Sequence, residues 1–99
     1  MSEANGHPAF VVDVTGVARS QLRAILRHAR YGARRTEVTR AFERVVAKLK
    51  EAPRASGDPL YHMRKMKMLI HHLVDRPLYF EYGVHDEQPV VVIRWVALL

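Results

Sequence analysis

The stretch MLIHHLVDRPLYFEYGVHDEQPVVVIRWVAL (residues 68–98) decides the fold of this chain. It contains runs rich in apolar, aromatic and β-branched residues at 68–74, 78–84 and 90–98, which is the composition of β-strands. Asp75-Arg76-Pro77 and residues 85–89 separate the runs. Links this short suit hairpins, whereas parallel strands need crossovers of about a dozen residues or more. We therefore predict consecutive antiparallel strands in this part of the chain.

A further strand and a first helix are predicted upstream. Residues 9–14 alternate Phe10, Val12 and Val14 with their neighbours, which suits a half-buried strand. After the Thr15-Gly16 break, one helical face carries apolar residues at i, i+3, i+4 and i+7, namely Leu22, Ile25, Leu26 and Ala29. We therefore expect a helix over 17–31, with Gly32 as its C-terminal stop.

A second helix is predicted from Thr36, a suitable N-cap, to Lys50. Its apolar stripe consists of Val38, Ala41, Phe42, Val45, Val46 and Leu49. Pro53 prevents it from continuing far, and Glu51 to Pro59 is expected to be a loop. The order β-α-α-β-β-β predicts an α+β fold, in which a helical hairpin packs on one face of a small, largely antiparallel four-stranded sheet. The other sheet face would remain available for a site.

Composition limits the class of protein. A chain of 99 residues that is 48% hydrophobic predicts one domain over 9–99, preceded by a flexible N-terminus at 1–8. The absence of cysteine excludes disulfides and thiolate metal sites and suits a cytoplasmic protein. Residues 1–8 lack the basic-then-apolar order of a signal peptide, and no apolar run reaches the roughly 18 residues that a membrane span needs. We therefore expect a soluble, unprocessed protein. The net charge of +6 favours nucleic acid or an acidic protein as partner.

Local motifs add a resemblance to a known family. Ala52-Pro53-Arg54 precedes Gly57-Asp58-Pro59-Leu60-Tyr61, the third strand ends in YGVHDE (82–87), and the last strand reads VVVIRWV (90–96). With the order of elements and the basic charge, these passages resemble the RelE/ParE superfamily of type II toxin–antitoxin toxins over nearly the whole chain. The resemblance implies a toxin that acts on mRNA at the ribosome or on DNA gyrase and is neutralised by an acidic antitoxin. The alternative is a non-catalytic nucleic-acid- or protein-binding module, a degenerate toxin on the same fold.

The sequence departs from the RelE nucleases at two places. Tyr79 stands roughly where those nucleases typically carry an early arginine of the third strand, and the sequence stops at Leu99, without their basic tail. Endoribonuclease activity is therefore left open. No metal or other cofactor is expected, because the sequence has no glycine-rich phosphate loop and no metal-ligand spacing of histidines. The small size leaves a homodimer open.

The candidate catalytic residues are His71, Tyr79 and Arg94. Histidine titrates near neutrality and can serve as a general acid or base. Successive strand residues point to opposite faces, so Tyr79 and Glu81 should lie opposite the core residues of their strand. With Lys67, the three candidates would line the open sheet face. The simpler alternative for Arg94 is a cross-strand ion pair with Glu81, and Trp95 is expected to be a packing residue.

Basic residues form two further candidate surfaces. Arg64, Lys65 and Lys67 precede the strand at 68–74 and are predicted to bind nucleic-acid phosphates; the alternative is an exposed basic edge that discourages aggregation. Helical arginines at intervals of three and four are predicted to bind the antitoxin: Arg19, Arg23, Arg27, Arg30, Arg40 and Arg44. A solvated face that keeps the protein soluble is the alternative for these arginines.

Overall fold

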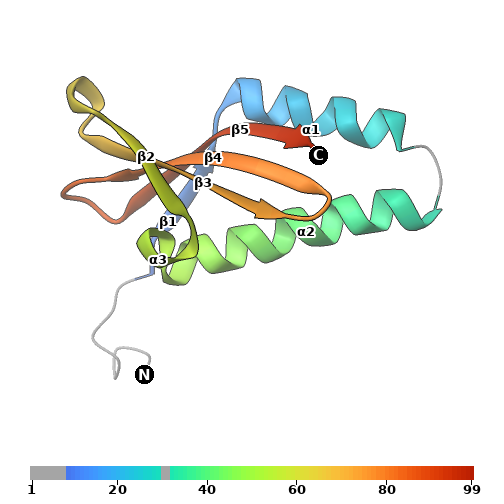
Figure 1. Cartoon of the computed structure of the whole chain (residues 1–99), viewed down its shortest axis with the longest axis horizontal. Coiled ribbons are helices and arrows are strands. Elements are labelled where there is room, and N and C mark those ends of the chain that lie inside the picture. The colour runs from blue at the N-terminus through green and yellow to red at the C-terminus, as the bar shows by residue number, and fades with distance from the viewer. Residues whose placement is uncertain (1–8, 30–31) are drawn as a thin grey trace.

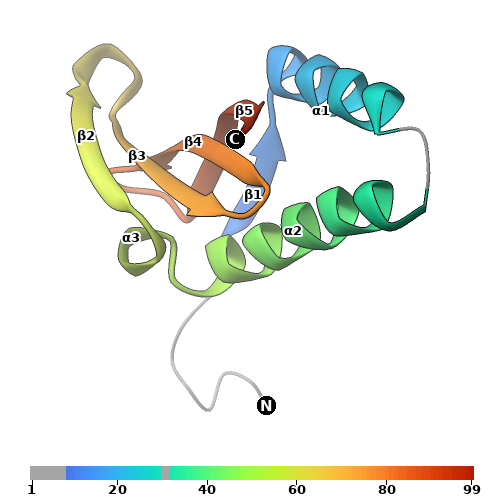
Figure 2. The same ribbon diagram turned by 45° about the vertical axis from the view of Figure 1, so that its right-hand side comes forward.

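The computed structural model describes residues 9–29 and 32–99, so the segment expected to be a flexible N-terminus, 1–8, lies outside the described residues. The elements are β1 (Val11–Val14), α1 (Gly16–His28), α2 (Gly32–Glu51), α3 (Pro53–Ser56), β2 (Asp58–Met63), the 3-10 turn η2 (Arg64–Met66), β3 (Met68–Asp75), β4 (Leu78–His85) and β5 (Val90–Leu98). They form a five-stranded sheet of order β1-β5-β4-β3-β2. Both long helices flank the sheet, and the β2–β3 hairpin projects away from them (Figures 1 and 2).

The predicted α+β class and the consecutive antiparallel pairing of β3, β4 and β5 are confirmed. The predicted number of strands is wrong, because β2 adds a fifth strand to the sheet. The sheet is also mixed, since β1 runs parallel to β5. The helices between β1 and the rest of the chain supply the long connection that a parallel neighbour requires.

The stretch from Glu51 to Pro59, which we expected to be a loop, contains the short helix α3 and the start of strand β2. The sequence of β2, DPLYHM, begins with Asp58 and Pro59, which are depleted in strands. Proline is nevertheless tolerated on an edge strand and near a strand start, and β2 is the edge strand beside β3. A β-bulge interrupts the pairing between Pro59 and Tyr61. The strand exists because β3 offers it a partner.

Both helices begin earlier than the sequence indicated. Helix α1 starts at Gly16, and the Thr15 hydroxyl caps it by accepting a hydrogen bond from the Ala18 N–H at 3.1 Å. Helix α2 starts at Gly32, so Thr36 is not its N-cap. The expected end of the first helix at residue 31 falls outside the described residues, and α1 ends at His28.

The core lies between the helices and one face of the sheet. The alternation predicted for β4 is confirmed: Leu78, Phe80, Tyr82 and Val84 are buried. They join a single apolar cluster with side chains from α1 and α2, including Ala18, Val38, Ala41, Val45 and Leu49. The predicted packing of both helices on one sheet face therefore holds.

A side chain of α1 completes the backbone bonding of β5. Among residues 9–29 and 32–99, strand β1 pairs with β5 between Val90 and Ile93, and no strand pairs with β5 beyond Ile93 on that side. The Val96 N–H donates instead to Gln21 Oε1 at 2.8 Å. The Gln21 side chain thus supplies a hydrogen-bond acceptor for a backbone N–H that has no partner among the described strands. Within the part of the chain that is described, no helix is long and apolar enough to cross a membrane.

Candidate functional site: the open face of the sheet

The sheet face that points away from the helices is called the open face here. On β4 it is formed by Tyr79, Glu81 and Gly83, which alternate with the buried core residues. Tyr79 and Glu81 thus lie where the sequence placed them. The Tyr79 hydroxyl donates to Glu81 Oε2 at 2.8 Å. Partial burial, and secondarily this hydrogen bond, raise the pKa of Tyr79 to about 12, so the phenol remains protonated at neutral pH.

The expected placement of His71 on the open face is wrong. His71 pairs with Tyr82, a core residue, in the β3–β4 register, and its side chain is 2% exposed. The two rings stack with their centroids 5.2 Å apart, and His71 Nδ1 lies 3.1 Å from the Leu69 carbonyl oxygen. A group in this position packs against the core and cannot reach a substrate on the open face.

The burial of His71 predicts a pH dependence of stability. Burial lowers the pKa of His71 below its ordinary 6.5, although the bond to the Leu69 carbonyl opposes the shift. As the pH falls below about 6.5, the unfolded chain therefore takes up a proton that the folded chain resists, and the free energy of unfolding decreases. Urea titrations between pH 7 and pH 5 measure this slope. We expect His71→Phe, which retains an aromatic ring, to reduce the change of the free energy of unfolding with pH, whereas His72→Phe should leave that change as it is in the wild type. An equal pH dependence in His71→Phe and the wild type would show that His71 does not cause it.

Arg94 does not form the expected ion pair with Glu81. A β-bulge shifts the β4–β5 register so that Tyr82 faces Ile93 while Glu81 faces Trp95, which leaves Arg94 as the extra residue. Its guanidinium reaches across the sheet, and Arg94 Nη1 lies 3.5 Å from the Tyr61 hydroxyl. Arg94 and Tyr79 therefore share the open face as predicted, but they have different partners.

Strand β2 borders the open face along the edge of β3, and the part of the face near the start of β3 is buried. Ile70 and Met68 are buried although they belong to the face opposite His71. Gly83 makes room for them, because a Cβ at this position would lie 2.9 Å from Met68 Sδ and 3.0 Å from Ile70 Cδ1. Tyr61 and Arg94 meet beside this small apolar cluster. The accessible part of the open face therefore lies toward the β3–β4 turn.

His72 and Trp95 are not among the site residues predicted from the sequence, yet both lie on the accessible part of the open face. Trp95 was expected to be a packing residue, but it is 46% exposed. His72 and Trp95 face Glu81 from its two neighbouring strands. Only the register across three strands brings these residues together, and the sequence carries no local signal of it.

The predicted phosphate-binding cations lie at the tip of the β2–β3 hairpin rather than on the open face. Arg64 and Lys65 belong to η2, and Lys67 follows it in a left-handed conformation with φ of 53°. All three side chains are exposed. The turn between β4 and β5 fixes the hairpin, because the Asp86 N–H donates to the Lys67 carbonyl at 2.8 Å and His62 Nε2 lies 2.8 Å from Asp86 Oδ2.

The helical arginines do not all remain available to a partner. Arg44 forms two hydrogen bonds with the Asp75 carboxylate, at 2.6 and 3.1 Å, and Lys48 Nζ approaches the same group at 3.7 Å. These cations hold the pKa of Asp75 below its ordinary value. Arg19 is close to the Val14 carbonyl oxygen, at 3.3 Å. The exposed candidates include Arg23, Arg27 and Arg40, and Arg30 lies outside the described residues.

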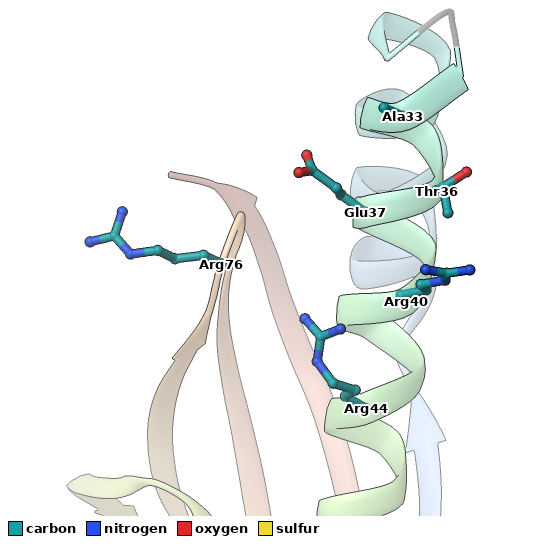
Figure 3. A pocket seen from close by; sticks show the side chains of 6 residues that line it. All are labelled: Ala33, Thr36, Glu37, Arg40, Arg44 and Arg76. Carbon is teal, nitrogen blue, oxygen red and sulfur yellow. The ribbon is translucent and has the colours of Figure 1, made fainter.

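A surface pocket of about 470 Å³ lies between α2 and the β3–β4 turn. Its lining consists of Ala33, Thr36, Glu37, Arg40, Arg44 and Arg76. Figure 3 shows Arg40 and Arg76 pointing away from each other, while the Glu37 carboxylate extends from α2 toward the turn. The guanidinium groups do not converge, so the pocket is not a built anion site. Among residues 9–29 and 32–99, no group of three or more His, Asp or Glu side chains is placed to hold a metal ion.

Comparison with known proteins places this geometry in context. No protein-family model matches the sequence, and no curated protein sequence matches it. Solved structures do match. A chain of the RelBE2 toxin–antitoxin complex from Mycobacterium tuberculosis is 21% identical, with a TM-score of 0.63 over 92% of each chain. A chain of the chromosomal ParDE system from Pseudomonas aeruginosa is 13% identical, with a TM-score of 0.62 over 94% of this chain and 99% of that one.

A third matching structure contains a toxin without its antitoxin. The isolated RelE toxin from Escherichia coli is 20% identical and has a TM-score of 0.56, over 91% of this chain and 84% of that one. The sequence identities are low. The similarity lies in the arrangement of helices and strands, over most of the length of this chain and of each matched chain. The resemblance expected from the sequence is thus confirmed at the level of the fold: this chain has the fold of the RelE/ParE superfamily of toxins.

Proposed function

We propose that this chain is the toxin component of a type II toxin–antitoxin pair, a cytoplasmic protein neutralised by an acidic antitoxin. The observation that carries the proposal is the RelE/ParE fold, which one chain of the M. tuberculosis complex shares over 92% of its own length and 92% of this chain. Structures with this fold include a RelE toxin bound to a peptide of its RelB antitoxin. Fold alone does not establish activity, so the residues have to supply the rest of the argument.

The helical surface supports an acidic partner. Arg23 and Arg27 of α1 and Arg40 of α2 are exposed, and the chain has a net charge of +6. Guanidinium groups bind carboxylates through paired hydrogen bonds, so an acidic segment laid along these helices would be held at several points. Arg44 contributes less to such a surface, because Asp75 already occupies it.

Two targets are consistent with the proposed toxin, namely mRNA at the ribosome and DNA gyrase. For mRNA, Arg64, Lys65 and Lys67 would bind phosphates at the hairpin tip, and Tyr79 and Arg94 would be the open-face groups nearest to the chemistry. Arg94 could stabilise the extra negative charge that develops during phosphodiester cleavage. The buried His71 leaves this proposed nuclease without its expected general base.

The second candidate is a binding module on the same fold without catalysis. Glu81 favours it, because this carboxylate is directed to the open face and held there by Tyr79. A carboxylate at this position repels phosphate. In this version the basic hairpin and helices bind nucleic acid or protein, and no bond is cleaved.

Inducible expression in bacteria tests the proposal. We expect the chain alone to arrest growth, with early loss of translation and cleaved mRNA if the target is mRNA, or with altered DNA supercoiling if the target is gyrase. Arg94→Gln should relieve the arrest if the open face acts on the target, because it removes the guanidinium and keeps a polar side chain. Arg34→Gln, in an exposed pair with Glu37 at 3.6 Å, is the matched control and should remain toxic. Normal growth of cells that contain soluble, folded wild-type protein would refute the toxin and favour the binding module.

A further inference from the structure

Three side chains from neighbouring strands form a row across the accessible part of the open face. Glu81 of β4 faces His72 of β3 on one side and Trp95 of β5 on the other. Directly opposed residues on one sheet face have Cβ atoms about 4.5–5.5 Å apart, within reach of one another's side chains. The carboxylate therefore stands between two aromatic side chains.

Tyr79 adds a third ring and orients the carboxylate. Its hydroxyl donates to Glu81 Oε2 at 2.8 Å, and its ring lies edge-on to His72 with centroids 6.1 Å apart. Oε1 of Glu81 takes no part in this bond and would be the oxygen that accepts a hydrogen bond from a ligand. The Glu81 side chain is only partly buried, and Trp95 is 46% exposed. The cluster of His72, Tyr79, Glu81 and Trp95, called the aromatic–carboxylate cluster below, is thus accessible from solvent.

The distribution of charge indicates the kind of ligand that this cluster fits. Of the 16 Lys and Arg residues of the chain, Arg94 is the one within the bounds of the five strands. Asp13 on β1 lies opposite Val92 on β5, on the same sheet face as Gly83. Within the described strands, the open face therefore carries the carboxylates of Glu81 and Asp13 and the guanidinium of Arg94. Among these strand residues carboxylates outnumber guanidinium groups, which favours a cationic ligand over phosphate.

We propose that the aromatic–carboxylate cluster binds a lysine or arginine side chain presented by a protein partner. Aromatic faces attract cations through their quadrupoles, and sets of rings around a cation form recognised binding cages. Glu81 would supply the counter-charge and Trp95 the contact area. Tryptophan and tyrosine are also the residues that most often dominate the binding energy of protein interfaces. The inference does not require toxicity, but within the proposed function it favours a protein target over an RNA target.

The chain provides its own probe, because Trp95 is its one tryptophan. The intrinsic fluorescence of the full chain is titrated with the peptide acetyl-Gly-Lys-Gly-amide at physiological ionic strength, which screens the net positive charge beyond about 8 Å. We expect saturable quenching or a spectral shift with the lysine peptide and none with its acetyl-lysine counterpart. In Glu81→Gln, which retains an acceptor for Tyr79, the dissociation constant should rise about five-fold.

A matched control separates this effect from net charge. Glu43→Gln changes the charge by the same amount on the exposed surface of α2 and should leave the dissociation constant unchanged. An equal response of the Glu81→Gln variant and the wild type would overturn the proposal. It would also be overturned if Trp95 responded to a single-stranded RNA decamer and not to the lysine peptide. These outcomes are independent of growth arrest, so failure of the lysine site and failure of the proposed toxin are distinguishable.

Discussion

Replacement of Tyr82 by alanine is expected to lower the free energy of unfolding by roughly 3–5 kcal/mol, the range for truncating a large buried aromatic side chain. Tyr82 is fully buried among the core residues. Its hydroxyl donates to the Pro53 carbonyl oxygen at 2.7 Å, and its ring stacks on His71. The substitution therefore removes core packing and the contact that joins β4 to α3. Because small domains are stable by only about 5–15 kcal/mol, thermal and urea denaturation should show a large loss.

Tyr82→Phe separates the contribution of core packing from that of the hydrogen bond to Pro53. It retains the ring in the core and removes the hydroxyl, so the Pro53 carbonyl loses its partner. We expect a loss of about 1–3 kcal/mol, the cost of leaving one buried polar group unsatisfied. If Tyr82→Phe were as unstable as Tyr82→Ala, the hydrogen bond would dominate and the packing argument would fail.

The second large effect is expected at Gly57, between α3 and β2. A Cβ atom at this position would lie 2.4 Å from the His72 backbone carbonyl oxygen and 2.6 Å from the Tyr82 hydroxyl. The backbone of Gly57 is extended, with φ of −144°, so the restriction is steric and not conformational. Relief requires a shift of the β3 backbone, and overpacking of this kind typically costs about 1–3 kcal/mol. We expect Gly57→Ala to reach the upper end of this range in urea denaturation.

Gly16→Ala is the matched control for Gly57→Ala. Gly16 is the first residue of α1, and a Cβ there would meet no atom within 4 Å. Alanine also restricts the unfolded chain more than glycine does, so this variant should be as stable as the wild type or slightly more stable. A loss of stability at Gly16 equal to that at Gly57 would contradict the steric explanation.

The exposed basic residues and the aromatic–carboxylate cluster lie at different places on the molecule. The exposed cations gather on the helices and at the hairpin tip, whereas the strands carry Arg94 alone among lysines and arginines. A partner rich in carboxylates would therefore be attracted to the helices, and a cationic side chain to the aromatic–carboxylate cluster. With this arrangement, an acidic antitoxin bound along the helices would not bring its carboxylates next to Glu81.

The sequence by itself determined the elements whose periodicity is strong. The alternation in LYFEYGV (78–84) identified the core face of β4, and the apolar stripe from Val38 to Leu49 identified the buried face of α2. Burial of apolar side chains is the largest favourable term in folding, and its spacing is written locally in the chain. The α+β class and the resemblance to the RelE/ParE fold followed from these elements and their order.

Only the tertiary structure decided how the elements meet. MLIHHLV (68–74) carries apolar residues on both faces: Leu73 packs in the core, while Met68 and Ile70 are buried on the other face over Gly83. Periodicity therefore could not tell which histidine is buried. The β2 edge strand, the parallel pairing of β1 with β5 and the bulge at Arg94 all depend on distant partners. A shift of one residue reverses the face of every side chain in a strand. His72, Glu81 and Trp95 therefore lie side by side because of the strand register. Contacts between residues far apart in the sequence set that register.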